Sequence, residues 1–311
     1  MGGTEGVPGD FSLRQLAHFV AVAELGTISA AADRLVMSPS AVSGSITELE
    51  RQLGAELCVR RRAQGVTLTP LGRQVLERAR RLLADAAELA YATRGGAELA
   101  GPVGIGCFLT LAPAVLPQLL DEMGTAHPQI TLDFLEGPQD VVRAALLEGT
   151  IDAAVLYDLG DLDELDTTVL FETRGYALFG AGHPLARRPT VTLAELAAEP
   201  LVLFDQPPST DYAMAAFREQ GLVPFVRHRT QSSELTRSIV ARGRSYAILV
   251  QRPAHTSSYE GLPIVEREVV PPLPTVRVVL GWPRGARLSP RARALADVTR
   301  RLYRDLSLIH I

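Results

Sequence analysis

The chain has 311 residues, 47% of them hydrophobic and 21% charged, and its formal net charge at pH 7 is −4. This composition predicts two or three folded domains and excludes a wholly disordered chain, and no run of about 18 apolar residues predicts a membrane span. The small net charge neither indicates nor excludes a nucleic acid partner, so the local distribution of charge matters more.

The first ten residues lack the basic and apolar segments of a secretion signal. We therefore expect residues 1–10 to be a flexible leader and the protein to be cytoplasmic, where thiols stay reduced. Cys58 and Cys107, the two cysteines of the chain, are accordingly expected to remain free thiols.

The segment after the leader predicts three short helices in close succession. Ser12 and Gln15 have the spacing of a capping box, and apolar residues then recur at helical spacing until Gly26. An alanine-rich helix is predicted over residues 28–35, after which Ser38-Pro39 is typical of a helix N-cap and first helical position. Two helices joined by about four residues, the second with a polar exposed face, indicate a helix-turn-helix.

A β-hairpin is predicted next, because short apolar runs at 57–59 and 66–68 flank a polar turn. The region from residue 58 to residue 81 also contains many more basic than acidic residues. Such a local surplus can bind phosphate groups, although a solvated helix face has the same composition. The basic residues are Arg60, Arg61, Arg62, Arg73, Arg78, Arg80 and Arg81, against the single acid Glu77.

A long helix is predicted from Thr69-Pro70 to about residue 94, with an apolar stripe along one side. The stripe favours pairing with a second copy of the same helix in a dimer, and packing on the rest of the same chain is the alternative. Glycines at 95, 96 and 101 indicate a hinge behind it. The stripe consists of Leu71, Val75, Leu82, Ala86 and Leu89.

Strands and helices alternate from residue 98 to residue 306, which predicts a largely parallel sheet covered by helices on both faces. The elements fall into two sets, so we expect a lobe I of residues 98–171 and 272–306 and a lobe II of residues 172–271. Ligands of such sheets bind at the carboxyl ends of the strands. The predicted organisation is completed by a winged helix-turn-helix domain at 11–70 and a linker helix with hinge at 71–97.

Several of these segments resemble LysR-type transcriptional regulators. Residues 11–24, 26–35, 38–46 and 66–72 match the opening of that family without a gap, and Leu49-Glu50 and Leu53-Gly54 continue the match. Ile105-Gly106, Pro113 to Pro117, Leu147 to Asp152 and Gly182 to Leu185 are similar to its effector domain. The resemblance implies an α/β protein with an N-terminal winged helix-turn-helix, a long linker helix and a two-lobed effector domain of the periplasmic-binding-protein-like (type 2) fold.

The resemblance also implies that the helix beginning at Ser38 binds in the major groove of promoter DNA. Hydroxyl groups discriminate bases less well than Arg or Asn, so phosphate contacts and DNA shape are expected to contribute. For Ser38, helix capping is the preferred role. At the position of Gly44 the family often has Arg or Lys, so this chain lacks one contact to a base or phosphate. At the position of Cys58 the family usually has an aromatic residue, so this chain has a smaller core side chain there. The expected DNA-binding residues are Ser38, Pro39, Ser40, Ser43, Ser45, Arg60, Arg61 and Arg62.

In the effector domain, polar side chains at strand-to-helix junctions resemble the family's ligand positions and suit a small carboxylate. Helix capping without any ligand is an equally good explanation of each polar residue taken singly. An aromatic side chain at residue 108 favours an apolar part in the ligand. The expected effector-binding residues are Phe108, Thr110, Ser209, Thr210, Gln231 and Ser232. The other expected partners are a second copy of the chain, in a dimer and further a tetramer, and RNA polymerase.

Catalysis has little support in the sequence. The six histidines lack metal-ligand spacing, and no nucleophile-elbow or phosphate-loop motif occurs, so no enzyme, metal or cofactor is predicted. Cys107 is either a redox sensor, as in some members of the family, or a buried inert thiol, which we prefer. A solute-binding module and an enzyme built on the same two-lobed fold are the alternatives to a regulator.

Overall fold

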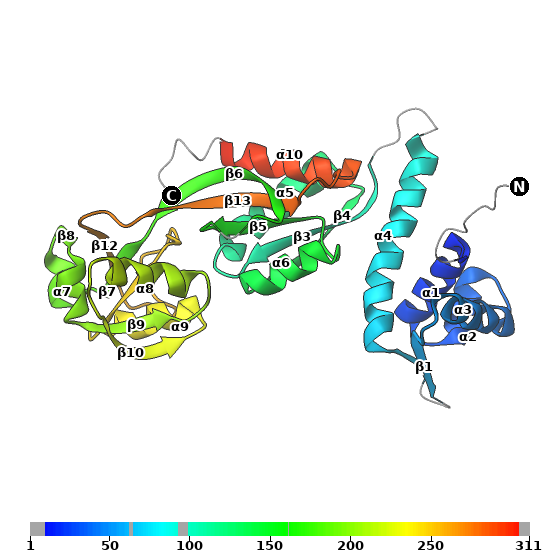
Figure 1. Ribbon diagram of the computed structural model, residues 1–311, viewed down its shortest axis with the longest axis horizontal. Coiled ribbons are helices and arrows are strands. Elements are labelled where there is room, and N and C mark those ends of the chain that lie inside the picture. Colours follow the sequence, from blue (N-terminus) through cyan, green and yellow to red (C-terminus); the bar gives the residue numbers. More distant parts are fainter. Residues whose placement is uncertain (1–9, 62–64, 93–98, 161, 305–311) are drawn as a thin grey trace, which may run out of the picture. The chain divides into compact units, whose positions relative to one another are not determined.

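The computed structural model describes residues 10–61, 65–92, 99–160 and 162–304. Contacts divide the chain into an N-terminal unit, Met1–Pro102, and a C-terminal unit, Val103–Ile311 (Figure 1).

The N-terminal unit consists of three short helices, a hairpin and a long helix. The predicted helix starts are confirmed: Ser12 and Gln15 form a capping box, and Ser38 caps the third helix with Pro39 in its first turn. Gly26 and Gly54 end the first and third helices in the left-handed conformation that glycine adopts without strain. The elements are α1 (Leu13–Leu25), α2 (Ile28–Leu35), α3 (Pro39–Leu53), β1 (Cys58–Arg61), β2 (Gly65–Leu68) and α4 (Pro70–Ala92).

The core of this unit lies between α1, α2 and α3. Ala31 and Ala32 are fully buried, and their small side chains let α2 pack closely against its neighbours. The hairpin is fixed to α3, because the Glu50 carboxylate accepts hydrogen bonds from the backbone N–H groups of Leu57 (2.8 Å) and Cys58 (2.9 Å). The start of α4 also lies close to the hairpin, since a Cβ on Gly72 would clash with the Leu57 carbonyl oxygen.

The C-terminal unit has two lobes, each built on a mixed sheet. In lobe I the strand order is β4-β3-β5-β13-β6, with β3 parallel to β5 and β13 antiparallel to β5 and β6. Helices α5 and α10 lie on one face of this sheet and α6 on the other (Figure 1). The elements are β3 (Gly101–Phe108), α5 (Ala112–Ala126), β4 (Ile130–Gly137), α6 (Gln139–Leu147), β5 (Ala153–Asp158), β6 (Leu165–Arg174), β13 (Thr275–Pro283) and α10 (Pro290–Arg304).

Lobe II has the strand order β10-β9-β11-β7-β12-β8. Strand β9 is parallel to β10 and β11, whereas β7 is antiparallel to β11 and β12. The elements are β7 (Tyr176–Gly180), the 3-10 turn η1 (Pro184–Arg187), β8 (Thr190–Val191), α7 (Leu193–Ala197), β9 (Pro200–Phe204), α8 (Ser209–Glu219), β10 (Phe225–Thr230), α9 (Ser233–Ala241), β11 (Tyr246–Leu249) and β12 (Ile264–Val269).

The expectation of largely parallel sheets holds only in part, because each sheet also contains antiparallel pairs. The sequence reading omitted β6, β8 and β12, and β6 and β12 pair antiparallel with strands that were predicted. The sheets are mixed because the chain passes between the lobes twice, after β6 and after β12. The strands next to these crossings run opposite to the strands with which they pair.

One side chain of lobe II forms hydrogen bonds with both crossing segments. The Tyr212 hydroxyl donates a hydrogen bond to the Pro274 carbonyl (2.7 Å) and accepts one from the backbone N–H of Gly175 (3.0 Å). A Cβ at Gly175 would lie 2.7 Å from the Tyr212 ring and 2.9 Å from Leu273, so only glycine fits there.

Candidate DNA-binding surface and effector cavity

The exposed start of α3 contains three of the predicted DNA-binding residues. Ser38, Pro39 and Ser40 are all exposed. The Ser38 hydroxyl accepts a hydrogen bond from the Ala41 N–H (3.2 Å) and lies 3.1 Å from the Ser40 hydroxyl. Ser38 therefore caps the helix, and Ser40 is the more accessible of the two hydroxyl groups for a ligand.

The middle of α3 presents less polar surface than the sequence predicts. Ser43 and Ser45 are half-buried, not exposed. The Ser45 hydroxyl lies 2.8 Å from Nδ1 of His18, which is itself buried on α1. Ser45 is therefore less exposed than predicted, because this hydrogen bond turns the side chain toward α1.

The buried ring makes the N-terminal unit sensitive to acid. Burial lowers the pKa of His18 below its ordinary value of 6.5, and the nearby charge of Arg14 lowers it further. Protonation thus favours the unfolded state, so stability is full above about pH 6.5 and falls as the pH decreases below it. We expect hydrogen exchange of the α1 and α3 amides, corrected for intrinsic rates, to speed up below that pH in the full-length protein.

His18→Asn, which cannot titrate but retains hydrogen-bonding groups, should remove this pH dependence. His127→Asn, in the C-terminal unit, is the matched control and should retain it. Equal pH dependence in the His18 variant and in the wild type would contradict the assignment.

The hairpin wing is positioned by its backbone. In β1, Arg60 pairs with Val66 and Arg61 with Gly65, and the Val66 N–H donates to the Gly26 carbonyl at the end of α1 (2.7 Å). The wing is thus tied to the turn before α2. The side chains of Arg60 and Arg61, and all of Arg62, lie outside the described residues.

The predicted apolar stripe of α4 is largely exposed. Leu71, Leu82 and Leu89 have 45%, 47% and 71% of their surface accessible, whereas Val75 packs against the core of the N-terminal unit. Three leucines on one helix therefore present apolar surface that no other described residue of the chain covers.

A cavity of about 900 Å³ lies between the two lobes, and it is called the interlobe cavity below. Lobe I contributes the start of α5, with Tyr157 at the end of β5, and lobe II contributes the starts of α8 and α9 and the segment 248–256. Its apolar wall includes Leu111, Phe171 and Ile248.

Two of the predicted effector-binding residues line this cavity. Thr110 does so from lobe I, with its hydroxyl 3.4 Å from that of Tyr157, and Ser209 does so from the start of α8 in lobe II. The strand-to-helix signal was therefore informative at these two junctions.

The other four predicted residues do not line the cavity. Phe108 is fully buried and packs edge-on against Tyr157 (5.4 Å between ring centroids), so it lies behind the wall. The Thr210 hydroxyl donates to the Phe204 carbonyl (3.1 Å), and Ser232 caps α9 by accepting from the Leu235 N–H. Gln231 and Ser232 are exposed at the junction. Helix capping and burial thus account for these positions.

The charged residues of the interlobe cavity were missed. Arg237 on α9 is only 3% exposed, and its Nη2 donates to the carbonyls of His255 (3.1 Å) and Ser257 (3.2 Å). Its Nε lies 3.2 Å from the Glu234 carboxylate, but buried Nη1 has no hydrogen-bond partner among the described residues. A buried cation that lines a cavity and has an unused donor is a candidate site for an anion.

A second arginine of the same cavity is fully paired. Arg252 forms ion pairs with Glu266 (2.9 Å) and Glu268 (2.7 Å) and lies over the ring of Tyr176 (4.3 Å). These contacts neutralise Arg252, so Arg237 is the stronger candidate for an anionic ligand.

Both cysteines are buried free thiols. Burial raises the pKa of Cys107, which keeps the thiol protonated and unreactive at neutral pH. We expect hydrogen peroxide to leave the intact mass of the native protein unchanged under conditions that oxidise an exposed thiolate. Cys107→Ser should respond to ligand like the wild type. Oxidation of Cys107 in the native protein, followed by a change in DNA affinity, would contradict this prediction.

Among the described residues, no group of three His, Cys, Asp or Glu side chains is placed to hold a metal ion, and no helix is both long and apolar enough to cross a membrane. A helix-turn-helix with a hairpin wing, followed by a two-lobed α/β unit with a large cavity between its lobes, defines a DNA-binding regulator that has a ligand-binding domain.

Comparison with known proteins gives the family. The bacterial regulatory helix-turn-helix proteins of the lysR family match residues 13–73, and the LysR substrate binding domain matches residues 96–304. The chain belongs to the LysR family of transcriptional regulators, which are not enzymes.

Individual relatives agree with this assignment. The HTH-type transcriptional regulator YnfL of Escherichia coli (strain K12) is 32% identical over 91% of this chain and 96% of its own length. The HTH-type transcriptional regulator EstR of Acinetobacter baylyi is 44% identical over 47% of this chain and 48% of its own. The crystal structure of HinK, a LysR family regulator from Pseudomonas aeruginosa, is 30% identical over 94% of this chain and 99% of its own, with a TM-score of 0.63.

Proposed function

We propose that this LysR-type regulator is controlled by a small molecule with a carboxylate group, which binds in the interlobe cavity and pairs with Arg237. The observation that carries the proposal is the buried guanidinium of Arg237, whose Nη1 lacks a hydrogen-bond partner among the described residues and which lines the cavity. A ligand carboxylate there would supply an acceptor for the unused donor, in addition to the Glu234 carboxylate that already pairs with Nε.

The cavity wall supports a ligand with an apolar body. Thr110 and Ser209 offer hydroxyl groups from opposite lobes, and Leu111, Phe171 and Ile248 offer apolar surface between them. A molecule of this kind would contact both lobes at once. Its binding would therefore stabilise the arrangement of the lobes in which both contact the ligand. The coupling free energy between ligand binding and DNA binding is typically about 1–3 kcal/mol.

On the DNA side, the start of α3 and the wing are proposed to contact promoter DNA. The exposure of Ser38, Pro39 and Ser40 supports α3, with Ser43 and Ser45 closer to the helix packing. The arginines at 60–62 are proposed to bind phosphates or the minor groove.

Self-association is proposed to use α4. The exposed surfaces of Leu71, Leu82 and Leu89 support pairing of this helix with its copy in a dimer, and further pairing of dimers would give a tetramer. Cytoplasmic location and a contact with RNA polymerase are parts of the same proposal.

The test is a titration of the full-length protein with aromatic and aliphatic carboxylates and with the matching amides, followed by calorimetry. We expect a carboxylate to bind and to change the affinity for promoter DNA. Thr110→Val combined with Ser209→Ala should abolish that response and leave DNA affinity in the absence of ligand near the wild-type value. Gln231→Ala, outside the cavity lining, is the control and should respond normally. Binding of amides and carboxylates with equal affinity would overturn the proposal.

A further inference from the structure

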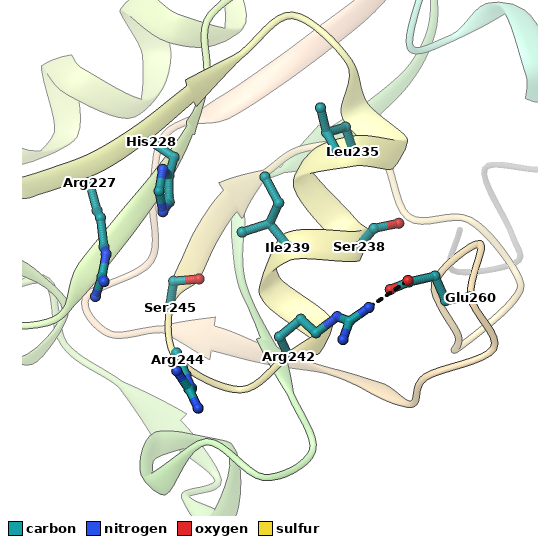
Figure 2. A pocket seen from close by; sticks show the side chains of 9 residues that line it. All are labelled: Arg227, His228, Leu235, Ser238, Ile239, Arg242, Arg244, Ser245 and Glu260. Atoms are coloured by element: carbon teal, nitrogen blue, oxygen red, sulfur yellow. Dashed lines mark hydrogen bonds and ion pairs between the residues drawn. The ribbon is translucent and has the colours of Figure 1, made fainter.

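Lobe II has a second pocket, of about 360 Å³, between β10 and α9 (Figure 2). It is called the lobe II pocket below. It shares no lining residue with the interlobe cavity. Figure 2 shows Arg227, His228, Arg244 and Ser245 along one side of it and the side chains of α9 along the other.

The charges around the lobe II pocket are mostly positive. Arg227, Arg242 and Arg244 line it together with one acid, Glu260, and that acid is paired with Arg242 (2.6 Å). Within the described part of lobe II, Arg227 and Arg244 have no carboxylate partner. Two unpaired guanidinium groups at one concave surface attract an anion and can bind it with charge-assisted hydrogen bonds.

The wall of the lobe II pocket also contains a serine hydroxyl. Ser245 lines the pocket, although only 3% of its surface is exposed. Figure 2 shows its oxygen turned toward α9, into the pocket. A hydroxyl group can donate a hydrogen bond to an anionic ligand and so add to the contacts of the two arginines.

The side of the pocket formed by α9 is apolar. Leu235 and Ile239 line it, and half of the Leu235 surface is exposed. The volume lies within the range of small-molecule sites, which is roughly 300–1,000 Å³. The pocket therefore suits a small molecule with an acidic group at one end and an apolar body at the other.

We propose that the lobe II pocket binds a small organic anion, whose acidic group pairs with Arg227 and Arg244 and whose apolar part packs on Leu235 and Ile239. The site is distinct from the interlobe cavity, so the chain would have two ligand sites.

Helix α9 connects the two sites. Ser233, Glu234 and Arg237 line the interlobe cavity, whereas Leu235, Ser238 and Ile239 line the lobe II pocket. A ligand that shifts this nine-residue helix on one side also shifts Arg237 on the other. Occupation of the lobe II pocket therefore changes the affinity of the interlobe cavity, and the reverse change is equal.

The test uses methyl NMR of the full-length protein with labelled isoleucines, because Ile239 lines the lobe II pocket and Ile248 lines the interlobe cavity. Valine substitutions assign the two signals. The probes are phenyl phosphate and benzoate. We expect saturable shifts of the Ile239 signal with at least one probe, and at least a tenfold weaker Kd in the double variant Arg227→Ala/Arg244→Ala.

The control is Arg187→Ala/Arg218→Ala, which removes two exposed arginines of lobe II that do not line the pocket and should leave the Kd unchanged. Lack of any Ile239 shift at millimolar probe, or equal weakening by both double variants, would overturn the proposal. These outcomes are separable from failure of the interlobe site, which is read from Ile248 and from the response to Thr110→Val/Ser209→Ala.

Discussion

Replacing Arg60, Arg61 and Arg62 by alanine is expected to lower the affinity of the full-length protein for every duplex by on the order of a hundredfold at ~0.1 M salt. Each arginine that contacts a phosphate releases counterions from the DNA. The logarithm of the binding constant therefore decreases less steeply with the logarithm of the salt concentration, and the magnitude of the slope should drop by about 0.9 for each lost contact. The hairpin backbone is held by the Glu50 carboxylate and the Gly26 carbonyl, neither of which depends on these side chains. The fold should therefore survive the substitutions.

The measurement is fluorescence anisotropy with promoter and unrelated fragments over a series of salt concentrations. The matched control replaces three exposed arginines of the C-terminal unit, Arg187, Arg218 and Arg287, and gives the same change in net charge. An unchanged salt slope in the wing variant, or an equal change in the control, would exclude a role of the wing in binding phosphates.

Replacing Arg237 by methionine is expected to abolish discrimination between a carboxylate ligand and its amide. A buried charge pair contributes roughly 2–5 kcal/mol when one partner is truncated, which corresponds to a loss of carboxylate affinity of about 30-fold to several thousandfold. The amide, which lacks the charge, should lose far less. Calorimetry with the carboxylate found by titration and its matching amide measures both values.

Two further variants separate recognition from packing. Arg237 also donates to the carbonyls of His255 and Ser257, so its loss could disturb that segment. Arg237→Lys retains the positive charge and should keep part of the preference for the carboxylate over the amide. Glu234→Gln combined with Arg237→Met removes both charges, so that no carboxylate of the protein is left without its partner. If every variant unfolds at the wild-type temperature and still prefers the carboxylate, the anion is bound elsewhere.

Local signals predicted the DNA-binding region well. The capping box of Ser12 and Gln15 and the Ser38-Pro39 helix start depend only on residues within one turn, so they could be recognised without knowledge of the fold. Thr110 and Ser209 were found for a similar reason, because each follows a strand and precedes a helix.

Features that depend on distant contacts could not be predicted. The Ser45 hydroxyl binds a ring 27 positions away in sequence, and Arg237 is buried because a segment about 20 residues later folds over it. An arginine in an amphipathic helix has the sequence pattern of a solvent-exposed residue, so no local signal marked it. The antiparallel strands β6 and β12 were likewise missed, since their partners lie in other parts of the chain.

The hydroxyl of Tyr212 has a consequence for how the lobes move. Because it bonds to Gly175 in one crossing and Pro274 in the other, neither crossing can twist without breaking a contact or carrying the other with it. We therefore expect the two crossings to move together when the lobes open. In Tyr212→Phe both bonds are lost, and small-angle scattering should then record a broader spread of interlobe angles in the ligand-free protein.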